Sequence, residues 1–361
     1  MTTRRDFLRG SAAAATGIVF CSCGLLQSAH GQQASRQKLP VSVGGKRVRT
    51  IDVHAHCVIP EASKLLGPAS PNTVRGGDEV VIDINKRLAA MDAQAVDMEV
   101  LSVNPNWYGR DRELAGQIVK IQNAKLAELC ASKPDRFAAF ASLTLQAPDL
   151  AAQELETAVK KQGLKGAAIG GNVAGEAFSD PKFFPVWAKA EELGASLFIH
   201  PQGVPELNKQ VAGNGWLSNA IAYPVETTIA LSHLIFEGTF DKFPGLKVIA
   251  AHGGGFLPSY ADRSDHACLV NPGGCNPDIK LKKQPTEYLK QIYFDSLVFT
   301  PEALRHLVAQ VGVAQVVLGS DYPFPWQLQP VDHIFASTSL SDDDKADILG
   351  RTAEKILNFG S

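Results

Sequence analysis

Short apolar runs alternate with longer helical stretches along most of the chain, and this alternation strongly limits its fold. Eight runs have the length and composition of β-strands: 48–56, 97–103, 137–145, 166–171, 196–201, 247–255, 292–298 and 316–323. Helical periodicity separates them, as in 112–132, and returns in 341–359 after the last run. Strands that alternate with helices predict a parallel sheet with covering helices.

The number of units indicates which parallel fold to expect. Eight strand-then-helix units in about 310 residues predict an α/β protein with a (β/α)8 TIM barrel. A doubly wound sheet is the competing fold, and it normally has a glycine-rich phosphate loop after its first strand. Here the first run ends in "HAH" at 54–56, which favours the barrel.

Bulk composition is that of an ordinary globular protein. The 361 residues are 45% hydrophobic and 20% charged, with a formal net charge of −2 and no long block of like charges. We therefore expect no nucleic-acid partner. Because no repeat or low-complexity linker follows residue 45, we predict one catalytic domain over 46–361.

The N-terminus differs from the rest of the chain. Arg4 and Arg5 begin a twin-arginine pattern, and the weakly apolar run at 11–26 is too short to cross a bilayer comfortably. Small residues at 29–31 offer a cleavage site. We predict that 1–31 is a twin-arginine signal peptide, that the protein is periplasmic, and that the mature chain has no stable membrane insertion.

Cysteine spacing leaves two questions open. Of the six cysteines, Cys21 and Cys23 lie within the predicted signal, where lipidation is a minor alternative. Cys268 and Cys275 bracket the loop-like "LVNPGG". In an oxidising compartment this pair could form a disulfide, and two free thiols fit the sequence equally well.

Chemically active side chains lie at the carboxyl ends of four predicted strands. They are His54, His56, His200, His252 and Asp321. A barrel gathers these ends at one rim, where active sites are built. Imidazoles with one carboxylate suit Zn²⁺ or another divalent first-row metal, with one position open for water. A lone His-x-His could be a hydrogen-bonded structural pair, but five such residues at strand ends favour a metal site.

Several segments resemble the amidohydrolase superfamily, and within it the α-amino-β-carboxymuconate-ε-semialdehyde decarboxylase family. They are "IDVHAH", "AAMDAQAVDMEVLSVNP", "FIHP", "ETTIALSHLIFEGTFDKFPGLKVIAAHGGG", "YFDSLVFTPEAL" and "VVLGSDYPFP". The resemblance implies a barrel of the metal-dependent hydrolase type in which His54, His56, His200 and Asp321 hold the metal. It also implies that His252 is the general acid/base.

The same resemblance bears on the number of metals. Relatives with two metals bridge them through a modified lysine at the end of the fourth strand, where "GAAIGGNVAG" has none, and Lys165 precedes that strand. One divalent ion is therefore expected, Zn²⁺ first and Mn²⁺ as the alternative.

Two arginines match the family's carboxylate-binding positions. Arg75 lies 12 residues before Arg87, and Arg263 lies 11 residues after His252, where the family has an arginine that enters the partner subunit's site. The resemblance thus implies a homodimer that binds a small-molecule carboxylate. Phe324 is expected in the pocket wall, as is Trp326.

Three functions remain in contention at this stage. The first is metal-dependent, non-oxidative decarboxylation of a small unsaturated or aromatic carboxylic acid, with His252 and Asp321 handling protons. The second is metal-dependent hydrolysis of an ester, lactone or amide by the same residues. The third is a non-catalytic, exported metal-binding protein, which would need neither His252 nor an arginine pocket.

Overall fold

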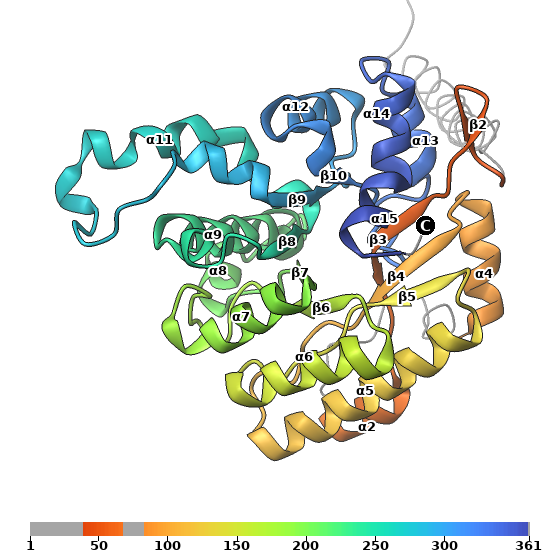
Figure 1. Cartoon of the computed structure of the whole chain (residues 1–361), viewed down its shortest axis with the longest axis horizontal. Coiled ribbons are helices and arrows are strands. Elements are labelled where there is room, and N and C mark those ends of the chain that lie inside the picture. Colours follow the sequence, from red (N-terminus) through yellow and green to blue (C-terminus); the bar gives the residue numbers. More distant parts are fainter. Residues whose placement is uncertain (1–38, 68–82, 360–361) are drawn as a thin grey trace, which may run out of the picture. The chain divides into compact units, whose positions relative to one another are not determined.

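A closed barrel of eight parallel strands forms the centre of the molecule (Figure 1). The computed structural model describes residues 39–67 and 83–359. The barrel strands are β3 (Ile51–His56), β4 (Met98–Ser102), β5 (Phe137–Ala139), β6 (Gly166–Ile169), β7 (Ser196–Ile199), β8 (Lys247–Ala250), β9 (Ile292–Asp295) and β10 (Val316–Val317). Each lies within one of the eight predicted runs, so the predicted barrel is confirmed.

Two seams close the sheet. Strands β6 to β10 pair in parallel as one ladder and β3 to β5 as another. At one seam the Val53 amide donates to Leu318 O (2.9 Å) and the His56 amide to Tyr322 O (2.6 Å). At the other, the Ala141 amide donates to Gly166 O (2.8 Å). Both ladders therefore join into one barrel whose carboxyl strand ends face the same rim.

Helices cover the outside of the barrel. The main ones are α4 (Ile84–Ala93), α5 (Arg112–Ser132), α6 (Pro148–Gln162), α7 (Phe184–Leu193), α9 (Tyr223–Phe236), α11 (Ala261–Val270), α12 (Pro301–Val311) and α13 (Pro330–Ala336). The final helical segment consists of α14 (Asp342–Ala346), η8 (Asp347–Arg351) and α15 (Thr352–Ile356). Helix α5 and the final helical segment match the helical patterns expected at 112–132 and 341–359.

Short helices account for the main differences from the sequence interpretation. The segments after β3 and β7 contain the short helices α2 (Pro60–Leu66) and α8 (Pro205–Gln210) and the single π-turn η2 (Ser218–Ala222), which show no helical pattern in the sequence. Like α13, both α2 and α8 begin with a proline, whose fixed φ suits the first helical position. Helices this short show too few turns for a clear apolar period.

The described part of the structure begins before residue 46. A hairpin of β1 (Ser42–Val43) and β2 (Lys46–Arg47) precedes the barrel, and Val41 and Val43 are buried. At the opposite end of the chain, Ile356 and Leu357 pack with Val53 and Val317 in the inner core. The C-terminal helix therefore closes the amino-terminal end of the barrel.

An insert after β8 extends outward past α9 and α12 (Figure 1). It contains η3 (His252–Gly254), η4 (Pro258–Tyr260), α11 and η5 (Pro272–Gly274). Cys268 and Cys275 form a disulfide there, which settles the question left open by the sequence. Within 39–67 and 83–359, no helix is both long enough and apolar enough to cross a membrane. The predicted signal peptide, 1–31, lies outside the described residues.

Candidate metal centre

Four buried side chains converge at the carboxyl end of the barrel. His54 and His56 project from β3, His200 directly follows β7, and Asp321 follows β10. One donor atom from each of the four lies within 4.8 Å of every other. The structure thus brings together the whole set that the sequence singled out as metal ligands.

Distances within the cluster fit a single ion. His54 Nε2 lies 3.1 Å from His56 Nε2, and Asp321 Oδ1 lies 3.1 Å and 2.9 Å from these two nitrogens. Ligand atoms about 2 Å from one metal are separated by roughly 3–3.5 Å. Among the described residues, neither ring nitrogen of His200 has a hydrogen-bond partner, although the side chain is buried. An unpaired buried imidazole is costly unless it has a ligand to bind, so the donor set fits a divalent metal.

Two outer contacts orient the histidines of β3. Asp295 Oδ2 lies 2.6 Å from His54 Nδ1, and Ser102 Oγ lies 3.1 Å from His56 Nδ1. Because Ser102 donates its own proton to Ala55 O (3.3 Å), its oxygen is free to accept from His56. Both imidazoles therefore carry a proton on Nδ1 and turn Nε2 toward the shared centre.

The electrostatic environment of the four candidate ligands favours a positive charge at their centre. Burial would lower the pKa of His54, but the carboxylates of Asp321 and Asp295 raise it to about 10. Burial lowers the pKa of His56, and burial with the adjacent imidazoles holds the pKa of His200 well below its usual range. Burial opposes ionisation of Asp321, yet the charge of His54 and the other imidazoles hold its pKa well below normal. The two neutral histidines and the carboxylate are thus ready to bind a cation.

His252 lies beside this cluster without belonging to it. Its Nε2 is 3.6 Å from Asp321 Oδ2, and its side chain is only 16% exposed. Asp295 accepts the backbone amides of His252 (2.9 Å) and Gly253 (2.8 Å) as well as the imidazole of His54. One carboxylate therefore fixes both a metal-ligand candidate and the turn that presents His252.

A buried ion pair supports the ligands from behind. Arg87 on α4 pairs with Glu99 on β4 through Nε and Oε2 (2.5 Å), and its Nη1 donates to His56 O (2.8 Å). Its guanidinium also stacks 5.0 Å from the ring centre of Tyr322, next to Asp321. Arg87 thus contacts the backbone of His56 and the ring of Tyr322, the residue that follows Asp321.

A second carboxylate holds the loop that follows His200. Glu226 on α9 accepts the backbone amides of Gln202 (3.2 Å) and Gly203 (2.7 Å) and the side chain of Asn172 (3.0 Å). Burial raises the pKa of Glu226, and these donors oppose that rise. The contacts tie the loop after β7 to the loop after β6.

The remaining predicted site residues are placed differently. Phe324 lies edge-on to His56, with ring centres 5.7 Å apart, and Trp326 packs further out. Arg263 is exposed on α11, and within 39–67 and 83–359 no contact joins it to the metal cluster. Arg75 lies outside the described residues. Lys165 packs against Phe359 near the C-terminus, at the end of the barrel opposite the cluster.

Asp295, Glu99 and Glu226 were not singled out from the sequence. Asp295 could have been recognised from its position at the carboxyl end of β9, because the other candidate site residues also lie at or after strand ends. Glu99 lies inside a strand and Glu226 within a helix, so their roles follow from contacts between elements.

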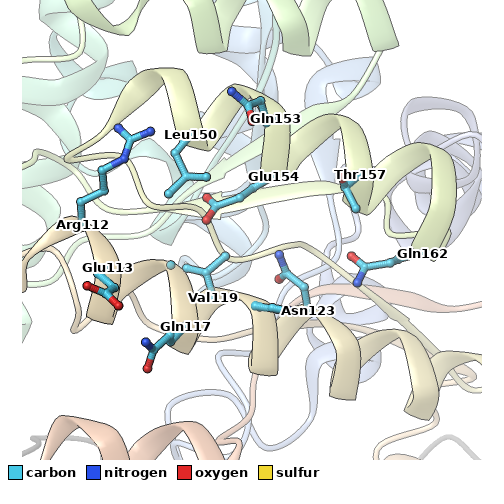
Figure 2. Close-up of a pocket in the computed structure, with 12 residues that line it drawn as sticks. Arg112, Glu113, Gln117, Val119, Asn123, Leu150, Gln153, Glu154, Thr157 and Gln162 are labelled. Carbon is cyan, nitrogen blue, oxygen red and sulfur yellow. The ribbon is translucent and has the colours of Figure 1, made fainter.

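A groove elsewhere on the surface carries no comparable chemistry. It has a volume of about 670 Å³ and lies between α5 and α6 (Figure 2). The Glu154 carboxylate there accepts from the amide and hydroxyl of Thr144 (2.7 and 2.8 Å). Asn123 is paired with both backbone groups of Ser142. None of the predicted site residues lines this groove.

Barrel topology and donor set together define a metal-dependent enzyme of the TIM-barrel class. The family model described as amidohydrolase matches residues 51–359. The chain therefore belongs to the amidohydrolase family.

Known relatives of this chain include several decarboxylases. A 2-amino-3-carboxymuconate-6-semialdehyde decarboxylase from Dictyostelium discoideum is 35% identical over 283 residues, which cover 77% of each chain. The solved 5-carboxyvanillate decarboxylase from Sphingomonas paucimobilis has a TM-score of 0.79 at 27% identity, covering 87% of this chain and 100% of the other. A dihydroxybenzoic acid decarboxylase from Polaromonas sp. JS666, solved with manganese and the inhibitor 2-nitroresorcinol, has a TM-score of 0.73 at 25% identity, covering 86% and 97%.

Replacing Asp295 with asparagine should weaken metal binding about 10- to 100-fold, because His54 loses the charged partner that fixes its tautomer. Isothermal titration of metal-free protein with Mn²⁺ measures this. Asp149→Asn, an exposed carboxylate paired with Arg112, is the matched control and should bind as the wild type does. Wild-type affinity in Asp295→Asn would exclude this positioning role.

Metal binding should release about one proton near neutral pH. The raised pKa of His54, about 10, means that metal must displace its Nε2 proton, whereas His56 and His200 are already neutral. Affinity should therefore rise about tenfold per pH unit between pH 6.5 and 8.5 and fall as the solution is acidified. Titrations in buffers of different ionisation enthalpy count the protons, and a pH-independent affinity would contradict the expectation.

Proposed function

We propose that this protein is a metal-dependent, non-oxidative decarboxylase of a small unsaturated or aromatic carboxylic acid. The observation that carries the proposal is the convergence of four buried donors at one point, with His252 beside them. The activities named for the relatives support the same reaction class. A divalent ion bound there would supply positive charge that holds the substrate and stabilises negative charge during the reaction.

Side chains of the protein would deliver the proton that the reaction requires. When the bond to the carboxyl group breaks, CO2 leaves, and the carbon that retains the electron pair must accept a proton. His252 can deliver it because an imidazole can donate a proton and the Nε2 of His252 faces Asp321. Asp321 is the second proton carrier in this scheme, and its burial limits the access of bulk water to it.

The identity of the metal forms part of the proposal. Three imidazoles and one carboxylate suit Zn²⁺, which is the proposed occupant, at one ion per chain. Manganese in the Polaromonas relative makes Mn²⁺ the alternative. Elemental analysis of purified protein distinguishes the two.

We also propose a homodimer in which Arg263 serves the partner subunit's substrate carboxylate. Arg263 is exposed on α11 and is not in contact with the metal cluster of its own chain. Large apolar side chains on α9, η4 and α11 are exposed, including Ile229 (45%), Tyr260 (68%) and Val270 (81%). Apolar exposure of this kind is typical of a surface that another protein covers.

Export by the twin-arginine route to the periplasm is the proposed localisation. The arginine pair at residues 4–5 supports it, and the Cys268–Cys275 disulfide suits an oxidising compartment.

Metal-loaded mature protein should release CO2 from unsaturated or aromatic acids, and His252→Asn should lower kcat by about 10²-fold or more while keeping its metal. Coupled CO2 detection and elemental analysis provide both readouts, with lactones, esters and amides assayed in parallel. Hydrolysis of those compounds without CO2 release would make the protein a hydrolase. Loss of metal from His252→Asn would identify His252 as a ligand.

Arg263→Ala and His252→Asn should each be inactive alone and recover activity as a heterodimer, because one site of the mixed pair receives both intact groups. Co-expression with two different tags and tandem purification isolates that species. Because only one of the two sites in the heterodimer is intact, the activity per dimer should reach up to about half of the wild-type value. Full activity of a monomeric fraction would exclude the shared site.

Cells that carry Arg4→Lys together with Arg5→Lys should retain the precursor inside, because the arginine pair is the export signal. Fractionation and immunoblotting measure the distribution. Unchanged delivery to the periplasm would contradict the proposed route.

A further inference from the structure

Asp52, the second residue of β3, contacts the chain on two sides of the metal centre. Asp52 and Ser320 are both fully buried. Asp52 Oδ1 accepts the backbone amides of His54 (3.0 Å) and Ser320 (3.2 Å), and Asp52 Oδ2 accepts the hydroxyl of Ser320. One carboxylate therefore holds the backbone at His54 and at the residue before Asp321.

The hydroxyl of Ser320 extends this contact past Asp321. The backbone amide of Tyr322 can only donate, so Ser320 Oγ accepts it (3.0 Å) and directs its own proton to Asp52. Between these two amides, that of Asp321 donates to His54 O (2.8 Å). Three consecutive backbone amides are thus fixed, and Asp52 holds the first directly and the third through Ser320.

The backbone of Asp321 adopts a conformation that needs such support. Its φ is +63°, in the left-handed region that residues other than glycine adopt rarely and at an energetic cost. In this conformation Asp321 Oδ1 lies 3.1 Å from His54 Nε2 and 2.9 Å from His56 Nε2. A negative φ would direct the side chain elsewhere, so the bonds that stabilise this φ also hold the carboxylate at the centre.

Two local features of the chain fit this arrangement. Gly319 permits a close approach, because a Cβ there would lie 2.7 Å from the Cβ of Asp295 and 3.0 Å from that of His54. The register between β3 and β4 shifts between Asp52 and Ala55, and irregularities of this kind re-aim side chains beside active sites. Both strands that supply ligands at this seam are therefore adapted next to the contact with Asp52.

We propose that Asp52 is a positioning residue that acts through Ser320 to hold Asp321 in place as a metal ligand. Burying a carboxylate is costly, and an interior that served packing alone would favour an apolar side chain at this position. The Asp52–Ser320 contact sets the affinity for the metal rather than only the stability of the barrel. This inference rests on the metal centre that the proposed function requires.

Metal titration of single and double variants tests the contact. In isothermal titration of metal-free protein with Mn²⁺, Ser320→Ala and Asp52→Asn should each bind about tenfold more weakly than the wild type. In the Asp52→Asn background, Ser320→Ala should cost less than about twofold more, because the serine has already lost its anchor. Ser142→Ala is the matched control and should bind as the wild type does, since Ser142 is a buried serine whose hydroxyl has no partner among the described residues.

Co²⁺ provides a second readout, because its visible absorption depends on the number and geometry of its ligands. The bands of Co²⁺-loaded Ser320→Ala should differ from those of the wild type and of Ser142→Ala, which a general loss of stability would not cause. Circular dichroism of metal-free protein verifies folding, and if Asp52→Asn does not fold, the comparison of Ser320→Ala with Ser142→Ala decides.

Three results would overturn the positioning role. They are wild-type Mn²⁺ affinity in Ser320→Ala, losses that multiply in the double variant, and weakened binding with an unchanged Co²⁺ spectrum, because Asp321 would then be correctly placed. If the variants behave as expected but no acid yields CO2, the positioning role stands and the proposed decarboxylation fails, since metal binding is measured without turnover.

Discussion

The seam between the first and last barrel strands is the constraint on which the site depends. At this seam the Asp321 amide donates to His54 O (2.8 Å) and the His56 amide donates to Tyr322 O (2.6 Å). These backbone bonds place a carboxylate from the end of the chain beside two imidazoles from its beginning. If β3 and β10 did not pair, the remaining ladder could hold His200 and His252 but would have no centre for them to face. The backbone bonds that close the barrel therefore also assemble the metal centre.

Burial and charge act together at this point. The ligand cluster rests on the apolar barrel interior, where Phe198 lies 5.1 Å from the ring centre of His54. A low-dielectric setting strengthens each electrostatic contact and penalises any unpaired charge. Asp321 and Asp295 flank His54 and raise its pKa, while burial lowers the pKa of His56 and of His200 and favours their neutral forms. The arrangement holds one positive charge comfortably, and a divalent ion satisfies all four donors at once.

Three carboxylates that are not candidate metal ligands support the metal centre. Asp295 joins β3 to the turn after β8, Glu99 holds Arg87 behind β3, and Glu226 fixes the loop after β7. Each links two elements that supply or flank a ligand.

Local sequence was sufficient for the barrel and for the five polar residues at its rim, because strand ends and helix periods leave patterns within a few residues of each other. It also indicated where the long helices lie. Short helices such as α2 and α13 escaped detection, since one or two turns show no clear period. The disulfide remained undecided because spacing alone does not reveal whether two thiols meet. The roles of Asp295, Glu99 and Glu226, and the contact of Asp52 with Ser320, were decided only by tertiary structure, because each depends on residues brought together across different strands and loops.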